Sequence, residues 1–350
     1  MNEMSFKKPG IVFGACLALA TGFWFGFGQS DKPGQGNPQS IQVRVDMVSI
    51  PVVVTTRDGR RVADLEKKDF EVYEDKVPQQ IAGFAATDEP ISVALLLDTS
   101  GSMQKKLARL QNEAIRFVNT LHPDDSVAIM SFADDVNLLE DFSIDRKRNE
   151  YGIKETRSNG GTALYEGVWL ALQEVLKPVR ERKALVLFTD GVDTVSRKAS
   201  ANETLQLAKE TQATIYCIYF NTEGDMDYRS PGAVGGVPLP MPRVRVGPGA
   251  QAPGSSSSEY YEGRRYLSQL AEYSGGVLFN ALTTEDLGPA FDGIAKELAS
   301  QYSIGYYPTN AKHDGKFRKI EVRVRRPDLV TRTKKGYYAP KDTVSKPPRQ

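Results

Sequence analysis

The chain has 350 residues, enough for one large domain and a smaller one. Its 40% hydrophobic and 25% charged residues are typical of a globular protein and exclude a disordered or fibrous chain. Lysine and arginine number 45 and aspartate and glutamate 44, so no overall field favours nucleic acid, and we expect no nucleic-acid partner.

The N-terminus combines basic and apolar residues in the order of an export signal. Lys7 and Lys8 precede an uncharged, mostly apolar run over residues 11–28. The run is near the length needed to span a bilayer, roughly 17–25 residues, so an uncleaved anchor is the alternative. We therefore expect residues 1–28 to be a signal peptide or N-terminal anchor, followed by a linker over 29–40. The protein is then exported to the periplasm, the cell envelope or the medium, and touches the membrane only through this segment.

Two stretches at either end of the chain have the alternation of β-strands. Residues 41–88 contain "IQVRVDMVSIPVVVTT" and "DFEVYED", and residues 301–340 contain "KFRKIEVRVRR". Each stretch alone is too small to form a core. We expect them to be the two parts of one small β-sandwich-like domain, with a tail over 341–350.

Between these flanks, residues 89–300 alternate apolar strands with amphipathic helices. Apolar runs such as "ISVALLLD" and "ATIYCIYF" are separated by segments with helical spacing. The pattern predicts an α/β domain with a doubly wound, mostly parallel sheet. A Gly/Pro/Ser-rich insertion over 221–262 leaves the sheet at the carboxyl ends of its strands. It is either a lid or rim at the ligand site or an insertion without a role.

Polar side chains follow three of the predicted strands at this same carboxyl edge, where open α/β sheets bind ligands. They are Asp98, Ser100 and Ser102 in "LDTSGSM", Thr162 in "SNGGTALYEG" and Asp190 in "FTDG". Taken singly, the serines and Thr162 could cap helices and Asp190 could begin a turn. Together they form a set of oxygen ligands of the kind that hard divalent cations prefer.

This set of motifs resembles the metal-ion-dependent adhesion site of von Willebrand factor type A domains, over about residues 89–300. The resemblance implies a divalent cation, Mg²⁺ or else Mn²⁺ or Ca²⁺, held directly by Ser100, Ser102 and Thr162. In that family the two acidic positions, here Asp98 and Asp190, often act through water. It also implies that a partner protein completes the coordination with an aspartate or glutamate carboxylate.

The flanks resemble a bacterial group of von Willebrand factor A-related proteins that is abundant in acidobacteria. The similar segments are "LEKKDFEVYEDKVPQQIAGF" before the α/β domain and "YSIGYYPTN" and "TKKGYY" after it. That group commonly has a glycine directly after "YED", where this chain has Lys76. The departure concerns a turn and leaves the metal motifs intact.

The sequence favours binding over catalysis, so we expect no enzyme. The chain has two histidines, His122 and His313, and neither lies near a motif. Nucleophile-elbow, zinc-protease and phosphate-loop motifs are absent from the sequence. We expect a metal-dependent, adhesion-type protein-binding module. The alternatives are an envelope assembly factor that uses the site within its own complex and, third, a metal-assisted hydrolase.

Overall fold

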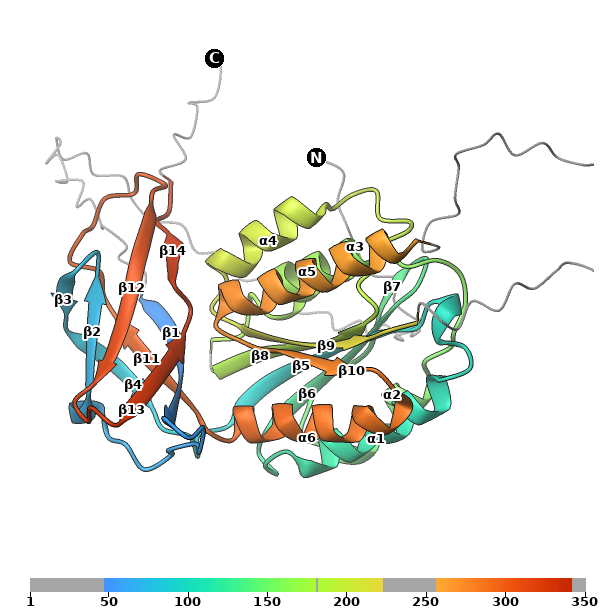
Figure 1. The fold of residues 1–350 in the computed structure, drawn as a ribbon, viewed down its shortest axis with the longest axis horizontal. Helices are drawn as coiled ribbons and strands as arrows, with labels where there is room; N and C mark the ends of the chain where they lie inside the picture. Colours follow the sequence, from blue (N-terminus) through green and yellow to red (C-terminus); the bar gives the residue numbers. More distant parts are fainter. Residues whose placement is uncertain (1–46, 181, 223–255, 342–350) are drawn as a thin grey trace, which may run out of the picture.

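The computed structural model describes residues 47–180, 182–222 and 256–341, which form two adjoining domains (Figure 1). One is a β-sandwich made from the two ends of this range, and the other is an α/β domain made from its middle. The expected signal segment, linker and tail lie outside the described residues. None of the described helices has the length and apolar character needed to cross a membrane.

The sandwich has two four-stranded sheets, and each sheet mixes strands from both flanks. The sheet orders are β13-β1-β11-β4 and β14-β12-β2-β3. Tyrosines and branched aliphatic side chains of both sheets bury one another in a shared core that includes Ile50, Val72, Tyr302 and Ile320. The strands are β1 (Val48–Thr56), β2 (Phe70–Glu74), β3 (Val77–Gln79), β4 (Ile81–Ala85), β11 (Gln301–Tyr306), β12 (Phe317–Val324), β13 (Leu329–Thr333) and β14 (Gly336–Tyr338).

The α/β domain is built on a six-stranded sheet with the order β10-β9-β8-β5-β6-β7. Five strands run parallel, and the edge strand β7 is antiparallel to β6. After β5 the chain adds β6 and β7 on one side of that strand, and it later adds β8, β9 and β10 on the other side. The strand order therefore switches between β5 and β8. The strands are β5 (Ile91–Asp98), β6 (Ser126–Phe132), β7 (Val136–Ser143), β8 (Arg182–Thr189), β9 (Thr214–Phe220) and β10 (Leu278–Ala281).

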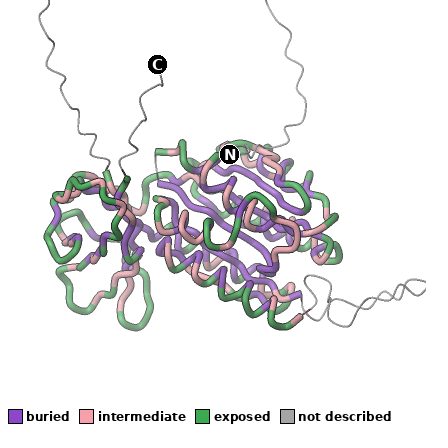
Figure 2. Tube along the Cα trace, turned by 90° about the horizontal axis from the view of Figure 1, so that it is seen from above, coloured by how far each residue is buried: buried purple, intermediate pink, exposed green. Residues whose placement is uncertain are grey.

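Helices cover both faces of this sheet, because its central strands are apolar on both sides. Val93, Leu95 and Leu97 of β5 face the core under one set of helices, and Ala94 and Leu96 face the other. Figure 2 shows the resulting buried strands running through the domain. On the first face lie α1 (Leu107–Thr120), α2 (Arg146–Lys154) and α6 (Leu287–Leu298), and on the second lie α3 (Leu164–Leu170), α4 (Ala201–Glu210) and α5 (Ser257–Ser274).

The predicted fold class is confirmed: a doubly wound, mostly parallel sheet is inserted into a β-sandwich built from both flanks. The sandwich lies at the amino ends of the parallel strands. Arg182, the first residue of β8, donates to the carbonyl of Gln301, the first residue of β11, at 2.7 Å. The carboxyl ends of the strands point away from the sandwich (Figure 1).

The turn between β2 and β3 contains Lys76, where the sequence departs from the bacterial group that its flanks resemble. Asp75 and Lys76 both have positive φ angles, 47° and 71°. A left-handed backbone favours glycine, which carries no Cβ to clash with the following carbonyl. Lys76 therefore takes a conformation that a glycine would adopt at lower cost.

Candidate metal site

Two buried carboxylates meet at the point where the strand order switches. Asp98 ends β5, Asp190 directly follows β8, and these two strands are parallel neighbours. Asp98 has no exposed surface and Asp190 is 3% exposed. Ligands of open α/β sheets bind in this crevice outside the carboxyl ends of the strands.

Asp98 is held entirely by uncharged donors. Its Oδ1 accepts from the Ser100 N–H at 2.9 Å, and its Oδ2 accepts from the Thr189 hydroxyl at 2.6 Å. Burial, together with the negative charge of Asp190, raises the pKa of Asp98 to about 7. The ionised pair is therefore costly for the chain without a compensating cation.

Asp190 is surrounded in a similar way. Its Oδ2 accepts from the hydroxyls of Thr222 at 2.6 Å and Ser102 at 3.4 Å, and its Oδ1 accepts from the Val192 N–H at 3.1 Å. Burial raises its pKa, and these donors oppose the rise, as does the nearby ammonium of Lys106. That ammonium lies 4.4 Å from the centre of the Phe220 ring.

The two serines face this carboxylate pair and do not cap a helix. The hydroxyl oxygens of Ser100 and Ser102 are 3.1 Å apart, and Ser102 reaches Asp190. Ser100 begins a short 3₁₀ turn without a side-chain capping bond, and Lys106 holds the corresponding position of α1. Helix capping therefore does not account for either serine hydroxyl.

Hydrogen bonds between the backbone of Thr162 and Thr194 hold Thr162 at the same edge of the sheet. Its N–H donates to the Thr194 hydroxyl at 2.8 Å, and its carbonyl accepts from the Thr194 N–H at 2.9 Å. It is not the N-cap of α3, since Ala163 holds that position. No hydrogen bond joins the Thr162 hydroxyl to the other four candidates, all of which belong to the described residues.

Hydrogen bonds also tie the loop before Thr162 to the loop after β5. The Ser158 hydroxyl donates to the Ser100 carbonyl at 2.7 Å, and the Gly101 N–H donates to the Gly160 carbonyl at 3.0 Å. Gly160 has a φ of +63°, which favours glycine, and a Cβ there would strike the Asp134 carboxylate at 1.9 Å. The glycines of "NGGT" therefore allow the two loops to approach each other.

The donor set fits a hard cation. It consists of oxygens only, two from buried aspartates and three from hydroxyl side chains. The described residues contain no group of three or more His, Cys, Asp or Glu side chains that could hold a metal. A cation here would therefore depend on hydroxyl ligands in addition to Asp98 and Asp190.

The sequence did not single out four residues that support this set. Thr189 and Thr222 donate to the two aspartates, Thr194 holds Thr162, and Lys106 lies near Asp190. Thr189 and Thr194 flank Asp190 in "FTDGVDT", so the motif itself carried a signal. Thr222 was included in the insertion, and only the path of the chain reveals its contact.

The insertion predicted over residues 221–262, either a lid or rim or a segment without a role, lies mostly outside the described residues. Its described C-terminal part differs from the prediction, because α5 begins at Ser257 and not near residue 263. Ser256 and Glu259 form a capping box at this helix start. Asp193, a carboxylate without a predicted role, accepts from the Tyr165 N–H and from Ser196.

The fold and the candidate site together define an α/β domain with buried polar residues at the carboxyl edge of its sheet, and comparison with known families agrees with this class. Residues 93–192 match the family described as von Willebrand factor type A domain. The chain therefore carries a von Willebrand factor type A domain, with its motifs at the carboxyl edge of the sheet.

One curated relative is the uncharacterized protein sll0103 of Synechocystis sp., which is 25% identical over 146 residues. The match covers 39% of this chain and 34% of the relative, so the chain spans about a third of that protein's length. This similarity concerns part of each protein and leaves the activity of both open.

Similar solved structures include three proteins at identities and TM-scores too low to indicate function. The von Willebrand domain of the pili tip protein Mfa5 from Porphyromonas gingivalis is 14% identical, with a TM-score of 0.43 over 59% of this chain and 94% of that one. A von Willebrand factor type A protein from Catenulispora acidiphila is 12% identical, with a TM-score of 0.46 over 77% of this chain and 72% of that one. A mussel byssus protein with a zinc-occupied metal site is 18% identical, with a TM-score of 0.43 over 62% of this chain and 47% of that one.

Proposed function

We propose that this domain binds a partner protein through a divalent cation, Mg²⁺ or else Mn²⁺ or Ca²⁺. Ser100, Ser102 and Thr162 would hold the cation directly, with Asp98 and Asp190 behind them. One observation carries the proposal: two buried carboxylates at the ends of neighbouring strands have hydroxyls and backbone N–H groups as their hydrogen-bond partners. Burial outweighs these donors, so a cation is the natural compensation for the pair.

The composition of the site favours recognition of an acidic side chain. When bound, the cation supplies a Lewis-acidic position that can accept one carboxylate oxygen of the partner. The three hydroxyl ligands are neutral, so they leave much of the cation's charge available to the partner. Thr194 and the loop glycines fix where Thr162 stands, and Thr189 and Thr222 orient the two aspartates.

We propose a binding role and not an enzymatic one. A hydrolase would need a general base, and histidine is the most frequent one. His122 lies in the turn before β6, at the opposite edge of the sheet, and His313 lies in the sandwich. The hydrolase alternative therefore lacks a histidine near the two aspartates.

We also propose that the protein works outside the cytoplasm. The support is Lys7 and Lys8 ahead of the apolar run over residues 11–28. Either an adhesion-type partner or a neighbouring envelope protein could then present the carboxylate. The second case is the assembly role, and it uses the same site.

The test is capture of partners on the immobilised protein in Mg²⁺, followed by elution with EDTA. We expect EDTA to release the specific partner, Thr162→Ala to lose it, and the exposed control Asp124→Asn to keep it. A partner from outside the cell favours adhesion, and an envelope protein of the same cell favours assembly. Partners that remain bound in EDTA, or that bind Thr162→Ala equally, would contradict the proposal.

A further inference from the structure

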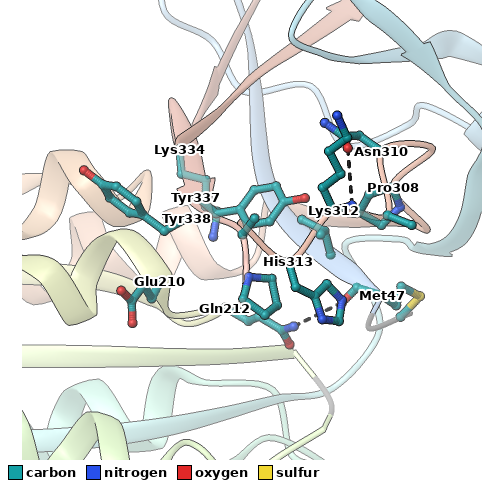
Figure 3. Close-up of a pocket in the computed structure, with 14 residues that line it drawn as sticks. Met47, Glu210, Gln212, Pro308, Asn310, Lys312, His313, Lys334, Tyr337 and Tyr338 are labelled. Atoms are coloured by element: carbon teal, nitrogen blue, oxygen red, sulfur yellow. Dashed lines mark hydrogen bonds between the residues drawn. The ribbon is translucent and has the colours of Figure 1, made fainter. Parts of the chain in front are cut away.

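A cavity of about 240 Å³ lies where the sandwich meets the α/β domain. Glu210 and Gln212 line it from the α/β side, and Lys334, Tyr337 and the loop around Pro308 line it from the sandwich (Figure 3). Gln212 leads into β9, so the cavity is at the amino edge of the sheet. It is therefore separate from the candidate metal site at the carboxyl edge.

Lys334 places a buried charge beside this cavity. The residue is 1% exposed, and its Nζ donates to the Thr211 carbonyl, at the end of α4, at 3.0 Å. An ammonium has three donors, and this is its one hydrogen bond among the described residues. Glu210 lines the same cavity, but no carboxylate of the described chain forms an ion pair with Lys334. In Figure 3 the side chain extends from the connection between β13 and β14 toward Gln212.

A buried ammonium without an acidic partner is costly, and an anion from outside the chain can lower that cost. Burial lowers the pKa of Lys334 to about 8, with no carboxylate opposing the shift. The group therefore still carries its proton at pH 7. Lys312 adds a second basic side chain to the lining, and His313 adds an imidazole ring.

The rest of the lining restricts the kind of anion that fits. Met47, Pro308 and Tyr337 supply apolar surface, which suits a hydrocarbon body. Glu210 accepts from the Gln206 amide at 2.9 Å and adds a negative charge that disfavours multiply charged anions. The volume is below the roughly 300–1,000 Å³ of sites for drug-sized ligands. A compact ligand with one negative charge matches these features.

We propose that this cavity binds a small organic carboxylate, with its anionic end on the Lys334 ammonium and its apolar body against Met47, Pro308 and Tyr337. The ligand would contact both domains, because Gln212 and Glu210 belong to the α/β domain and the other residues to the sandwich. The proposal is independent of the metal site and of the protein-binding role.

The test is calorimetric titration of the purified protein with benzoate and with benzamide, its neutral analogue of the same shape. We expect saturable binding of benzoate and binding of benzamide at least about tenfold weaker, the size expected for a lost charged hydrogen bond. Lys334→Met, which keeps most of the side-chain volume, should remove this preference. Lys335→Met should keep it, because Lys335 is exposed and pairs with Glu272.

A second variant covers the case in which Lys334→Met does not fold. Ala311→Phe fills the cavity from its exposed rim and leaves Lys334 in place. It should weaken benzoate binding by about tenfold or more. Equal binding of benzoate and benzamide, no saturable binding of benzoate, or wild-type affinity in Ala311→Phe would each overturn the proposal.

Discussion

Buried charged side chains have different surroundings at the two edges of the α/β sheet. At the amino edge, the Arg182 guanidinium donates to the carbonyls of Thr87, Glu89, Leu298 and Gln301, on the two connections that join the domains. Nearby, Glu297 is 7% exposed and pairs with Arg61 and Arg332. Most of the buried charge at this edge is thus compensated by the chain itself.

At the carboxyl edge, the buried charges have the same sign. Asp98 and Asp190 repel each other, and hydroxyls and N–H groups are their hydrogen-bond partners. Burial alone is therefore a poor sign of function, since both edges show it. What separates the two edges is the sign of the buried charges: the amino edge contains both signs, and the carboxyl edge brings two carboxylates together, with the Lys106 ammonium near one of them. At the amino edge, Lys334 is distinguished by the cavity that it lines, and the second proposed site is there.

The largest expected effect is at the amino edge. Arg182→Met leaves four carbonyl partners without their donor, two of them in buried hydrogen bonds, and we expect a loss of about 3–5 kcal/mol in the free energy of unfolding. The loss should be the same with and without Mg²⁺. Urea unfolding measures it, and Arg60→Met is the control, since its pair with Asp58 is on the surface and should matter by less than about 1 kcal/mol. A small loss of unfolding free energy in Arg182→Met, or a loss that depends on Mg²⁺, would contradict the difference between the two edges.

The second effect concerns pH and Lys334. Its pKa falls from 10.5 in the unfolded chain to about 8 in the folded one, so between these values the unfolded state binds more protons. Stability must then rise with pH through this window, by up to about 3 kcal/mol. Other groups titrate here as well, so the measurement is the difference between wild type and Lys334→Met at pH 7 and pH 10. A difference that does not change with pH would show that Lys334 is not buried in this way.

A smaller effect at the carboxyl edge would sharpen the comparison. Thr194→Val keeps the shape of the side chain but removes the oxygen that accepts from Thr162, at a cost of about 1 kcal/mol in positioning. We expect Mg²⁺ affinity to fall by about fivefold with little change in melting temperature. Thr194→Ser, which restores the hydroxyl, should recover the affinity. Loss of stability without loss of affinity would make Thr194 a purely structural residue.

Much of the architecture could be predicted from the sequence, because it depends on local hydrophobic patterns. The apolar runs of β5, β8 and β9 gave the parallel sheet, and the carboxyl ends of the strands gave the candidate residues. β7 and α2 were not predicted, since the half-buried edge strand "VNLLEDFS" and the polar "RKRNEYGIK" lack a clear apolar face. The early start of α5 was missed because Ser256 and Glu259 resemble the insertion in composition.

Contacts between distant segments could not be predicted. Lys334 stands beside another lysine in "TRTKKGYY", a pattern typical of a solvated turn, and only the docking of the sandwich on α4 buries it. Thr222 reaches Asp190 because β9 and β8 are neighbours. Such contacts depend on tertiary packing, which the local pattern does not contain.

The most direct test of the account is Mg²⁺ titration by calorimetry of the wild type, Asp98→Ala and Thr162→Ala, with Asp124→Asn as the exposed acidic control. The account predicts one saturable site in the wild type and in the control, and its loss in both site variants. Unchanged Mg²⁺ affinity in Asp98→Ala and Thr162→Ala would contradict the central claim that this edge of the sheet holds a cation.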